Sequence, residues 1–355
     1  MSEIISQKKR LLLIGANGWL AQFLYANLLR SKIAENIEIY TTYHLNKPFW
    51  ISENCLQMDL GDFHSIEQTL SEVNPDIILH LAAITAPAKC HQNPDQSTNV
   101  NSPTSILHIV KRLNQNALYI FTSTDMVYDG NNPPYLPEFN AAPVNVYGKT
   151  KLSFEQQILE NLENGIILRL SNMLGPAYQY NPCGEKFLEW LYNAFDKREV
   201  IGLKADEVRS FVNVFDVSDL ILQIVSRYSS HFTTLSPASW LPFQPENHQD
   251  RIFNVGGPTG LSRLDIAKIL SAAYETELII IEKDQSEFVD RSDRSKWFVH
   301  VMPPALSTNQ PTDCSVLVSP RDITMLSQRT EEVWGVAFQP VAQYIKAHIS
   351  SMHNN

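Results

Sequence analysis

Tyr147 and Lys151, four residues apart, are the pair of side chains in this sequence best suited to proton transfer. In a helix this spacing puts the phenol and the ammonium group on one face, where the charge can act on the hydroxyl. A tyrosine pKa of about 10 must fall by roughly 3 units, or about 4 kcal/mol, for work near neutral pH. One cation at about 4 Å supplies about that much at an effective dielectric constant near 20. Because Tyr-x-x-x-Lys also occurs by chance, a second motif is needed.

Thr124 is the third candidate catalytic residue. The β-rich run Leu118 to Thr122 reads as a strand that delivers Thr124 to its carboxyl end. Open α/β sheets bind their ligands at that edge. There the Thr124 hydroxyl would hold and polarise a substrate carbonyl from the side opposite Tyr147.

A glycine loop follows the first apolar run, where residues 15–21 read GANGWLA between a predicted strand and a predicted helix. Gly15 permits the tight turn, Gly18 lets the backbone approach a pyrophosphate, and Ala21 lets the helix pack close to the strand. Free N–H groups and the helix dipole would receive the anion. The alternative is a glycine turn without a ligand. The candidate cofactor contacts here are Gly15, Asn17, Gly18, Trp19 and Leu20.

The end of the second predicted strand bears on the choice of cofactor. An NAD site places a carboxylate there, about 20 residues beyond the loop, to bond the ribose 2'-hydroxyl. Here the strand ends in Thr42 and Tyr43, and Glu38 lies too early to reach its tip. His44 or Lys47 could bind a 2'-phosphate. We therefore expect NADPH to be preferred, with NADH as the alternative cofactor.

Strands and helices alternate through the first half of the chain, as a parallel sheet covered by helices requires. The fold class that we predict is a Rossmann-type α/β fold, with a doubly wound parallel sheet and a smaller C-terminal substrate-binding lobe. The predicted strands are Leu11–Ile14, Ile37–Tyr43, Asp76–Leu81, Leu118–Thr122 and Ile166–Leu170; the predicted helices are Leu20–Leu29, Ser65–Val73, Ser102–Leu113 and Lys149–Leu162.

The alternation ends near Asn172, which we take as the domain boundary. We expect residues 1–172 to form the dinucleotide-binding domain, to which 210–228 and 251–257 return. Residues 173–209 and 258–355 would form the lobe. Two irregular stretches, Ser229–Asp250 and Gln285–Asp313, are predicted to be loops of this lobe.

Composition excludes several classes of function. A net charge of -10 argues against a nucleic-acid or anionic-membrane partner, because phosphate backbones require a concentrated positive field. The four cysteines are scattered and form no CxxC pair, and the histidines have no ligand-like spacing, so no metal site is expected. No apolar run approaches the roughly 20 residues of a membrane span. We expect a cytoplasmic protein.

Together these motifs resemble the extended short-chain dehydrogenase/reductase family, whose members act largely on nucleotide-linked sugars. The resemblance covers nearly the whole chain. Within the family, FTSTDMVYDG at 121–130 and YGKTK at 147–151 look most like dTDP-4-dehydrorhamnose reductases. The branch also contains the regulatory β subunit of methionine adenosyltransferase. The resemblance makes Tyr147 the proton donor, and Lys151 the residue that binds the nicotinamide ribose.

Further residues carry over position by position. The HLAA segment at 80–83 is similar to the strand and loop that face the cofactor, and Asp59, followed by Leu60, matches the adenine-side acid. Asn99 matches a cofactor-site asparagine. Asn172 and Arg209 fall where relatives touch the nucleotide-sugar substrate, the arginine at its diphosphate; a structural ion pair is the alternative for Arg209. The remaining implied cofactor contacts are Leu81, Ala82 and Ala83.

One departure from the family pattern concerns Met126. Sugar dehydratases of this family place a glutamate there, and a thioether cannot act as a general base. Simple reduction of a nucleotide-linked 4-keto-6-deoxy sugar is therefore favoured over dehydration. A nucleotide-sugar 4-epimerase and an NAD(P)-binding regulatory subunit that docks to a partner enzyme stay open. A homodimer stays open as well.

Overall fold

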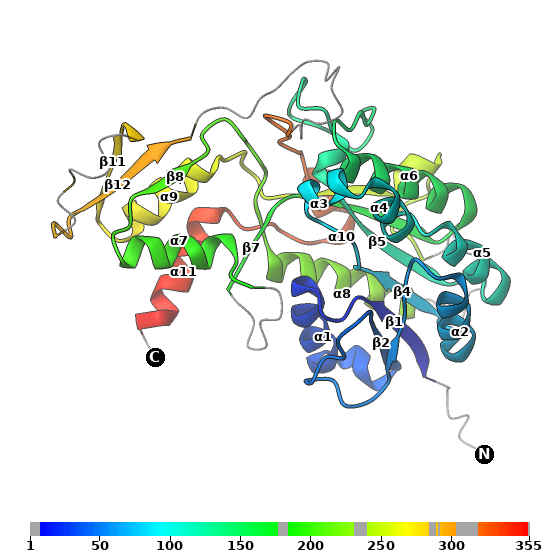
Figure 1. Ribbon diagram of the computed structural model, residues 1–355. Helices are drawn as coiled ribbons and strands as arrows, with labels where there is room; N and C mark the ends of the chain where they lie inside the picture. The colour runs from blue at the N-terminus through cyan, green and yellow to red at the C-terminus, as the bar shows by residue number, and fades with distance from the viewer. Residues whose placement is uncertain are drawn as a thin grey trace.

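A computed structural model describes residues 8–176, 184–230, 240–283, 289, 292–302 and 319–353 of the chain. They form a large domain around a seven-stranded sheet, here called the sheet domain, and a smaller lobe around a three-stranded sheet. The sheet domain lies on the right in Figure 1 and the lobe on the left. Helix α11 (Val341–His353) at the C-terminal end lies in the lobe, whereas β1 (Lys9–Ile14), the first described strand, lies in the sheet domain (Figure 1).

The large sheet has the order β10-β6-β5-β4-β1-β2-β3, and every pair of neighbours in it is parallel. The strand order reverses beside β1, which creates the crevice where such sheets bind ligands. The predicted Rossmann-type fold is confirmed. Its strands are β1 Lys9–Ile14, β2 Ile37–Tyr43, β3 Cys55–Gln57, β4 Ile77–His80, β5 Leu118–Thr124, β6 Gly165–Leu170 and β10 Ile252–Val255.

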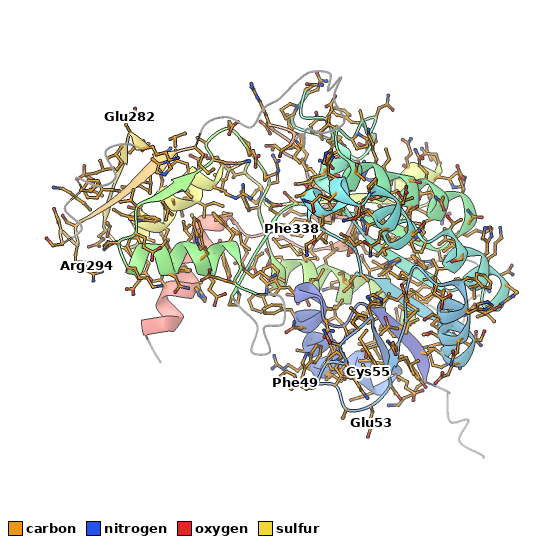
Figure 2. The ribbon with its side chains drawn as sticks, in the orientation of Figure 1. Phe49, Glu53, Cys55, Glu282, Arg294 and Phe338 are labelled. Carbon is orange, nitrogen blue, oxygen red and sulfur yellow. The ribbon has the colours of Figure 1, made fainter. Side chains whose placement is uncertain are left out.

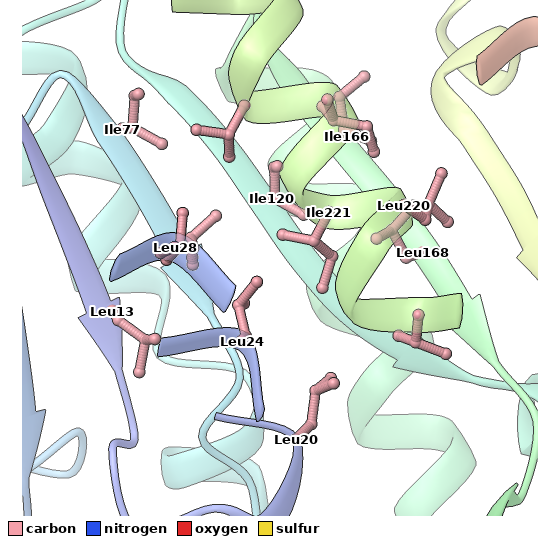
Figure 3. Close-up of a cluster of buried hydrophobic side chains, with 14 of the residues drawn as sticks. Leu13, Leu20, Leu24, Leu28, Ile77, Ile120, Ile166, Leu168, Leu220 and Ile221 are labelled. Atoms are coloured by element: carbon pink, nitrogen blue, oxygen red, sulfur yellow. The ribbon is translucent and has the colours of Figure 1, made fainter. Parts of the chain in front are cut away.

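Helices cover both faces of this sheet. The face with α1 and α8 contains Leu11 and Leu13 of β1, and the opposite face, with α2, α5 and α6, contains Leu12 and Ile14. Figure 3 shows Leu24 and Ile221 meeting over the strands on the first face. Because both faces are buried, the strands read as continuous apolar runs. The helices are α1 Trp19–Arg30, α2 Phe63–Val73, α3 Pro87–Gln92, α4 Pro94–Asn101, α5 Thr104–Leu113, α6 Val146–Asn161, α8 Val214–Ser230 and α10 Gln328–Trp334.

The lobe is built on a parallel sheet in the order β11-β12-β8. Trp297 of β12 is fully buried and packs with side chains of the lobe helices. Two short strands, β7 Met173–Leu174 and β9 Val212–Asn213, form a separate two-stranded sheet. Each lies where the chain passes between the sheet domain and the lobe. The elements of the lobe are α7 Phe187–Asp196, β8 Ile201–Leu203, α9 Arg263–Ala273, β11 Glu277–Ile281, β12 Lys296–Val301 and α11 Val341–His353.

The prediction that Ser229–Asp250 is a loop of the lobe was wrong for its described part. Trp240 is buried in the sheet domain, where its ring meets Tyr228 edge-on and its Nε1 donates to Asn164 Oδ1 at 3.0 Å. A short 3₁₀ helix, His248–Arg251, then leads into β10. Arg251 donates to the Leu159 carbonyl oxygen at 2.7 Å and thereby joins the segment to the end of α6.

The second predicted loop, Gln285–Asp313, was also wrong in part, because it contains β12. The mixed charges of this stretch obscured the alternating pattern of β12, in which Trp297 and Val299 point into the core of the lobe. Residues 303–313 lie outside the described residues. The chain near Trp334 and Phe338 packs in the core of the sheet domain, although its position in the sequence assigned it to the lobe. Figure 2 shows Phe338 between the two parts, with Arg294 at the far end of the lobe.

Candidate active site

A cavity of about 820 Å³ lies at the carboxyl ends of the central strands, where β1, β4 and β5 finish. It joins the glycine loop to the predicted catalytic residues. Twelve of the sequence-predicted site residues line it, which are Gly15, Asn17, Gly18, Trp19, Leu20, Leu81, Ala82, Ala83, Thr124, Tyr147, Lys151 and Asn172. Asp59, Leu60, Asn99 and Arg209 do not line it.

The glycine loop has the geometry of a phosphate cradle. Gly15 has φ of 96°, and a Cβ there would lie 2.8 Å from the Cβ of Ala82, so only glycine fits this turn. Gly18 begins helix α1 without a side-chain cap, which leaves the first-turn N–H groups for a ligand. A dinucleotide pyrophosphate therefore fits the residues present.

The cavity continues past the end of β2, where Tyr43, His44 and Asn46 line it. Asn17 Nδ2 donates to the Asn46 carbonyl oxygen at 2.6 Å and fixes this turn beside the glycine loop. Asp59 stands outside the lining, but its Oδ2 lies 3.4 Å from His44 Nε2. Glu38 is the second residue of β2, far from the tip. The strand tip that faces the cavity thus carries an imidazole in place of a carboxylate.

Thr124, Tyr147 and Lys151 converge because β5 ends beside the first turns of α6. Asn145 caps that helix by accepting from Gly148 N at 2.8 Å. A Cβ at Gly148 would lie 2.1 Å from the Met126 carbonyl oxygen, so glycine allows α6 to approach the segment after Thr124. Helix α6 begins at Val146, three residues before the predicted start, and so includes Tyr147. All three catalytic candidates are buried.

Burial controls the proton affinities of the pair. It raises the pKa of Tyr147 above its ordinary value, and the charges of Asp125 and Cys90 act in the same direction, while a hydrogen bond with Thr124 opposes them. Burial lowers the pKa of Lys151 to about 7, against the attraction of Glu155. The expectation that Lys151 brings the tyrosine pKa near neutrality was wrong, because both groups are desolvated and the lysine itself loses its charge more easily.

Lys151 lies against an aromatic ring. Its Nζ is 3.8 Å from the centroid of Phe121, and its side chain is only 1% exposed. A ring face attracts an ammonium group but replaces only part of its hydration. Lys151 therefore lines the cavity, and the protein compensates only part of its charge.

A buried polar network beneath the pair was missed from the sequence. Glu155, one turn after Lys151 on α6, accepts from Ser123 Oγ and makes a salt bridge of 2.8 Å with Arg169 of β6. Arg169 also donates to the Tyr128 hydroxyl at 2.9 Å. The signal was present, since Arg169 is a charge inside the otherwise apolar strand GIILRL, and a buried charge needs a partner.

The asparagine that holds the site together is Asn101, and Asn99 is exposed on the same helix, α4. Asn101 accepts from Ile84 N at 2.8 Å and donates to Thr150 Oγ1 at 3.2 Å. It thereby joins the loop after β4 to the turn of α6 between Tyr147 and Lys151. The periodicity of a helix separates the two asparagines by about 200°, which the sequence motif alone did not resolve.

Arg209 is occupied by backbone oxygens. Its guanidinium donates to the carbonyls of Val208 at 2.7 Å, Arg321 at 3.0 Å and Pro320 at 2.9 Å. It is only 2% exposed and fastens the segment around Pro320 to the lobe. Arg209 is therefore bonded to the backbone and does not line the cavity, although its charge acts on Asp125, which does.

Other chemistries find little support in the described ranges. No group of three or more histidine, cysteine, aspartate or glutamate side chains there could hold a metal ion. In the same residues, no helix is long and apolar enough to cross a bilayer.

Fold and site together define a Rossmann-type nucleotide-binding protein with a Thr-Tyr-Lys centre. The chain belongs to the family described as "RmlD substrate binding domain", whose model matches residues 9–249. This places it in the extended short-chain dehydrogenase/reductase family, in the branch that includes dTDP-4-dehydrorhamnose reductases and the methionine adenosyltransferase β subunit, as its motifs predicted.

Individual relatives fall into two groups. The chain is 34% identical over 119 residues to the methionine adenosyltransferase 2 subunit beta of Pongo abelii, an overlap of 34% of this chain and 36% of that one. It is 27% identical over 278 residues to a dTDP-4-dehydrorhamnose reductase of Sinorhizobium fredii, which covers 75% of this chain and 85% of the relative. The matches to four of the β subunits thus span about a third to a half of their length.

Solved structures show the same fold. The crystal structure of the dTDP-4-dehydrorhamnose reductase from Bacillus anthracis in complex with NADP superposes with a TM-score of 0.68. The two chains are 19% identical, and the match covers 97% of this chain and 99% of that one. Because the likeness extends over nearly the whole length, it includes the smaller lobe as well as the sheet domain.

Proposed function

We propose that this protein is an NADPH-preferring reductase that transfers hydride to the keto carbon of a nucleotide-linked 4-keto-6-deoxy sugar. The observation that carries the proposal is that Thr124, Tyr147 and Lys151 share one cavity with the glycine loop. A phosphate cradle without a proton donor would indicate binding alone. A proton donor beside a dinucleotide site indicates reduction of a carbonyl.

The cofactor would lie along the cavity from the end of β2 to Lys151. Gly15, Gly18 and Leu20 would hold its pyrophosphate at the start of α1, and the nicotinamide supplies the hydride when it is bound. The imidazole of His44 at the tip of β2 favours a 2'-phosphate over a free hydroxyl. NADH remains the alternative cofactor. The relative from Bacillus anthracis, crystallised with NADP, supports the nicotinamide assignment.

Tyr147 suits the direction of reduction. Because burial raises its pKa, the phenol keeps its proton at neutral pH and can give that proton to the oxygen of a reduced carbonyl. Thr124, which interacts with Tyr147, would donate to the same carbonyl and orient it. Asn172 lines the cavity on the substrate side. In the reverse direction the same tyrosine would have to be a base, which its raised pKa disfavours.

Met126 limits the chemistry further. It lines the cavity directly after the Thr124–Asp125 pair, where its thioether can accept no proton from carbon. Asn145 Nδ2 lies 3.8 Å from its sulfur, which fixes the side chain beside the catalytic helix. Dehydration of the sugar therefore lacks its base, whereas reduction does not require one at this position.

The test is the oxidation of NADPH, followed at 340 nm, with a dTDP-4-keto-6-deoxy sugar as substrate. One NADPH should be consumed for each deoxy sugar formed, and Tyr147→Phe should lower kcat/KM by about 10²- to 10⁴-fold without weakening NADPH binding. No turnover across a panel of such sugars would overturn the reductase assignment. Tightly bound NAD released from denatured protein, with no net oxidation, would point to an epimerase.

A second candidate is a regulatory subunit that keeps the nucleotide site for docking to a partner enzyme. It is favoured by the 34% identity over 119 residues to the methionine adenosyltransferase subunit. In the described parts of Ser229–Asp250 and Gln285–Asp313, Trp240 and Trp297 are buried and so offer no docking surface. Stoichiometric capture of a methionine adenosyltransferase catalytic subunit by the purified chain would establish this role.

The division of labour follows from the same site. We propose that residues 1–172, with 210–228 and 251–257, bind the dinucleotide in a cytoplasmic enzyme. Residues 173–209 and 258–355 would contribute the substrate side, apart from α10 and the chain near Phe338, which pack on the sheet domain. Deleting the lobe should remove sugar binding. A lobe-deleted protein that stays folded and still binds the sugar would contradict this division.

A further inference from the structure

A cation would stabilise a diphosphate bound in the cavity, and Arg209 does not line that cavity. A protein with a net charge of -10 must attract a polyanion by local charges. Among the described residues that line the cavity, the lysine and arginine side chains are those of Lys151 and Lys186. Lys151 is buried beside Phe121 at the catalytic end. Lys186 is therefore the cavity-lining cation that we consider as the partner of a diphosphate.

Lys186 enters the cavity from the lobe. It immediately precedes α7, and its backbone N donates to Glu189 Oε2 at 3.4 Å, which fixes the start of that helix. Other cations of the lobe are placed differently. Arg263 pairs with Glu207 at 3.2 Å, and Arg294 lies at the far end of the lobe, where it donates to the Asp196 carbonyl oxygen (Figure 2).

The ammonium of Lys186 lies close to the phosphate loop. Its Nζ is 5.3 Å from the ring centroid of Trp19, the first residue of α1. Trp19 is itself held across the two parts of the molecule, because its Nε1 donates to the Pro176 carbonyl oxygen at 3.1 Å. At Gly175 a Cβ would come within 3.1 Å of the indole, so glycine leaves room for this ring.

We propose that Lys186 is a clamp for a diphosphate group bound in this cavity, which it reaches from the smaller lobe. If the diphosphate is that of the cofactor, the N–H groups of α1 would hold one side of it and the ammonium the other. The face of the Trp19 ring attracts the ammonium group and helps to keep it near the first residue of α1. The inference rests on the proposed function and adds to it the cation that binds the ligand.

The diphosphate has two sources, the dinucleotide cofactor and the nucleotide of the sugar. Binding of NADPH and of dTDP, each alone and measured by calorimetry, distinguishes them. Lys186→Gln should weaken at least one of the two by about tenfold, the size of a lost charge-assisted hydrogen bond. Lys186→Arg keeps the charge and should stay within about threefold of the native protein. The ligand that loses affinity identifies the source of the diphosphate.

Lys197→Gln is the matched control, because Lys197 follows the same helix at its other end and is exposed. It removes one charge from the lobe without touching the cavity and should leave both affinities unchanged. For Lys186→Gln, the dependence of the affected affinity on salt should also weaken.

Two outcomes count against the clamp and are distinct. If the native protein binds both ligands and Lys186→Gln changes neither by more than about twofold, the clamp is wrong and the reductase assignment stands. If the native protein binds neither NADPH nor dTDP, the proposed function falls and the clamp falls with it.

Discussion

Two buried cations of the sheet domain, Arg169 and Lys151, lie in the same region but differ in how their charge is balanced. Arg169 meets both oxygens of Glu155, the Tyr128 hydroxyl and the Pro137 carbonyl, and these partners raise its pKa. Lys151 lies over the Phe121 ring, and burial lowers its pKa to about 7. One carboxylate, Glu155, attracts both groups, but its oxygens bond to the arginine.

The difference separates a structural charge from a functional one. A charge that supports the fold is most useful when every donor has a partner, because an unpaired buried ion costs several kcal/mol. A charge that must respond to a ligand is useful when the protein leaves it incompletely balanced. The sheet domain thus contains a polar network around Arg169 in which the charges are paired. Above it lies the Tyr147–Lys151 pair, in which the lysine charge is incompletely balanced. Mutations can disturb the network and the pair separately.

Arg169→Met is expected to have the largest effect on stability. It leaves the Glu155 carboxylate buried without its partner, which should lower the free energy of unfolding by about 3–5 kcal/mol. Urea denaturation followed by circular dichroism measures the change. Pairing it with Glu155→Leu should recover most of the loss, and a single variant as stable as the native protein would refute the network.

Lys151→Met is expected to act in the opposite direction on stability. The pKa of Lys151 is lowered from 10.5 to about 7 on folding, so between these values the unfolded chain binds the proton and the native one does not. Stability therefore rises with pH across this window, and the full penalty is present below pH 7. At pH 6 the variant should be more stable by about 2–4 kcal/mol. Its kcat/KM should fall at least about 100-fold, because the nitrogen proposed to bind the nicotinamide ribose is lost, and the neutral amine can donate that hydrogen bond as well.

The control for this variant is the same stability measurement at higher pH. The stability difference between Lys151→Met and the native protein should shrink as the pH approaches 10.5 in urea titrations. A destabilised variant at pH 6 would show that the ammonium is compensated after all.

Ser123→Ala is expected to have the smallest effect of the three. It removes the hydroxyl that donates to Glu155 and leaves the Arg169 salt bridge intact. The loss should be about 1–2 kcal/mol of unfolding free energy, with the proton affinity of Tyr147 unchanged. Urea titrations of the variant give the first quantity. A loss as large as that of Arg169→Met would assign the serine a central place in the network.

Much of the fold could be predicted because both faces of the large sheet are covered. Such strands are continuous apolar runs, and their helices show a regular apolar face, so Leu11 to Ile14 and Leu118 to Thr122 were recognised. Strand β3, of three residues at the sheet edge, carries too little pattern to be seen. Strand β12 was missed because half of its residues face outward and its flanks are rich in charge.

The site was predictable where a local motif fixes it. Gly15, Thr124 and Tyr147 each stand at a strand or helix end that the sequence marks, and all three line the cavity. Proton affinities were not predictable, because they depend on burial by residues distant in the chain. Arg209 and Lys186 show the same limit, since only the packing of the lobe decides which cation faces the phosphate loop.

The central claim is that the buried centre keeps a proton on Tyr147 and gives it up only to a reduced carbonyl. The most direct test is kcat/KM for NADPH-dependent reduction between pH 7 and pH 9. Because burial raises the pKa of Tyr147, the account predicts that the reductive rate falls by less than about threefold over this range, while the oxidative rate climbs throughout. A tenfold loss of reductive rate per pH unit above pH 7 would contradict it.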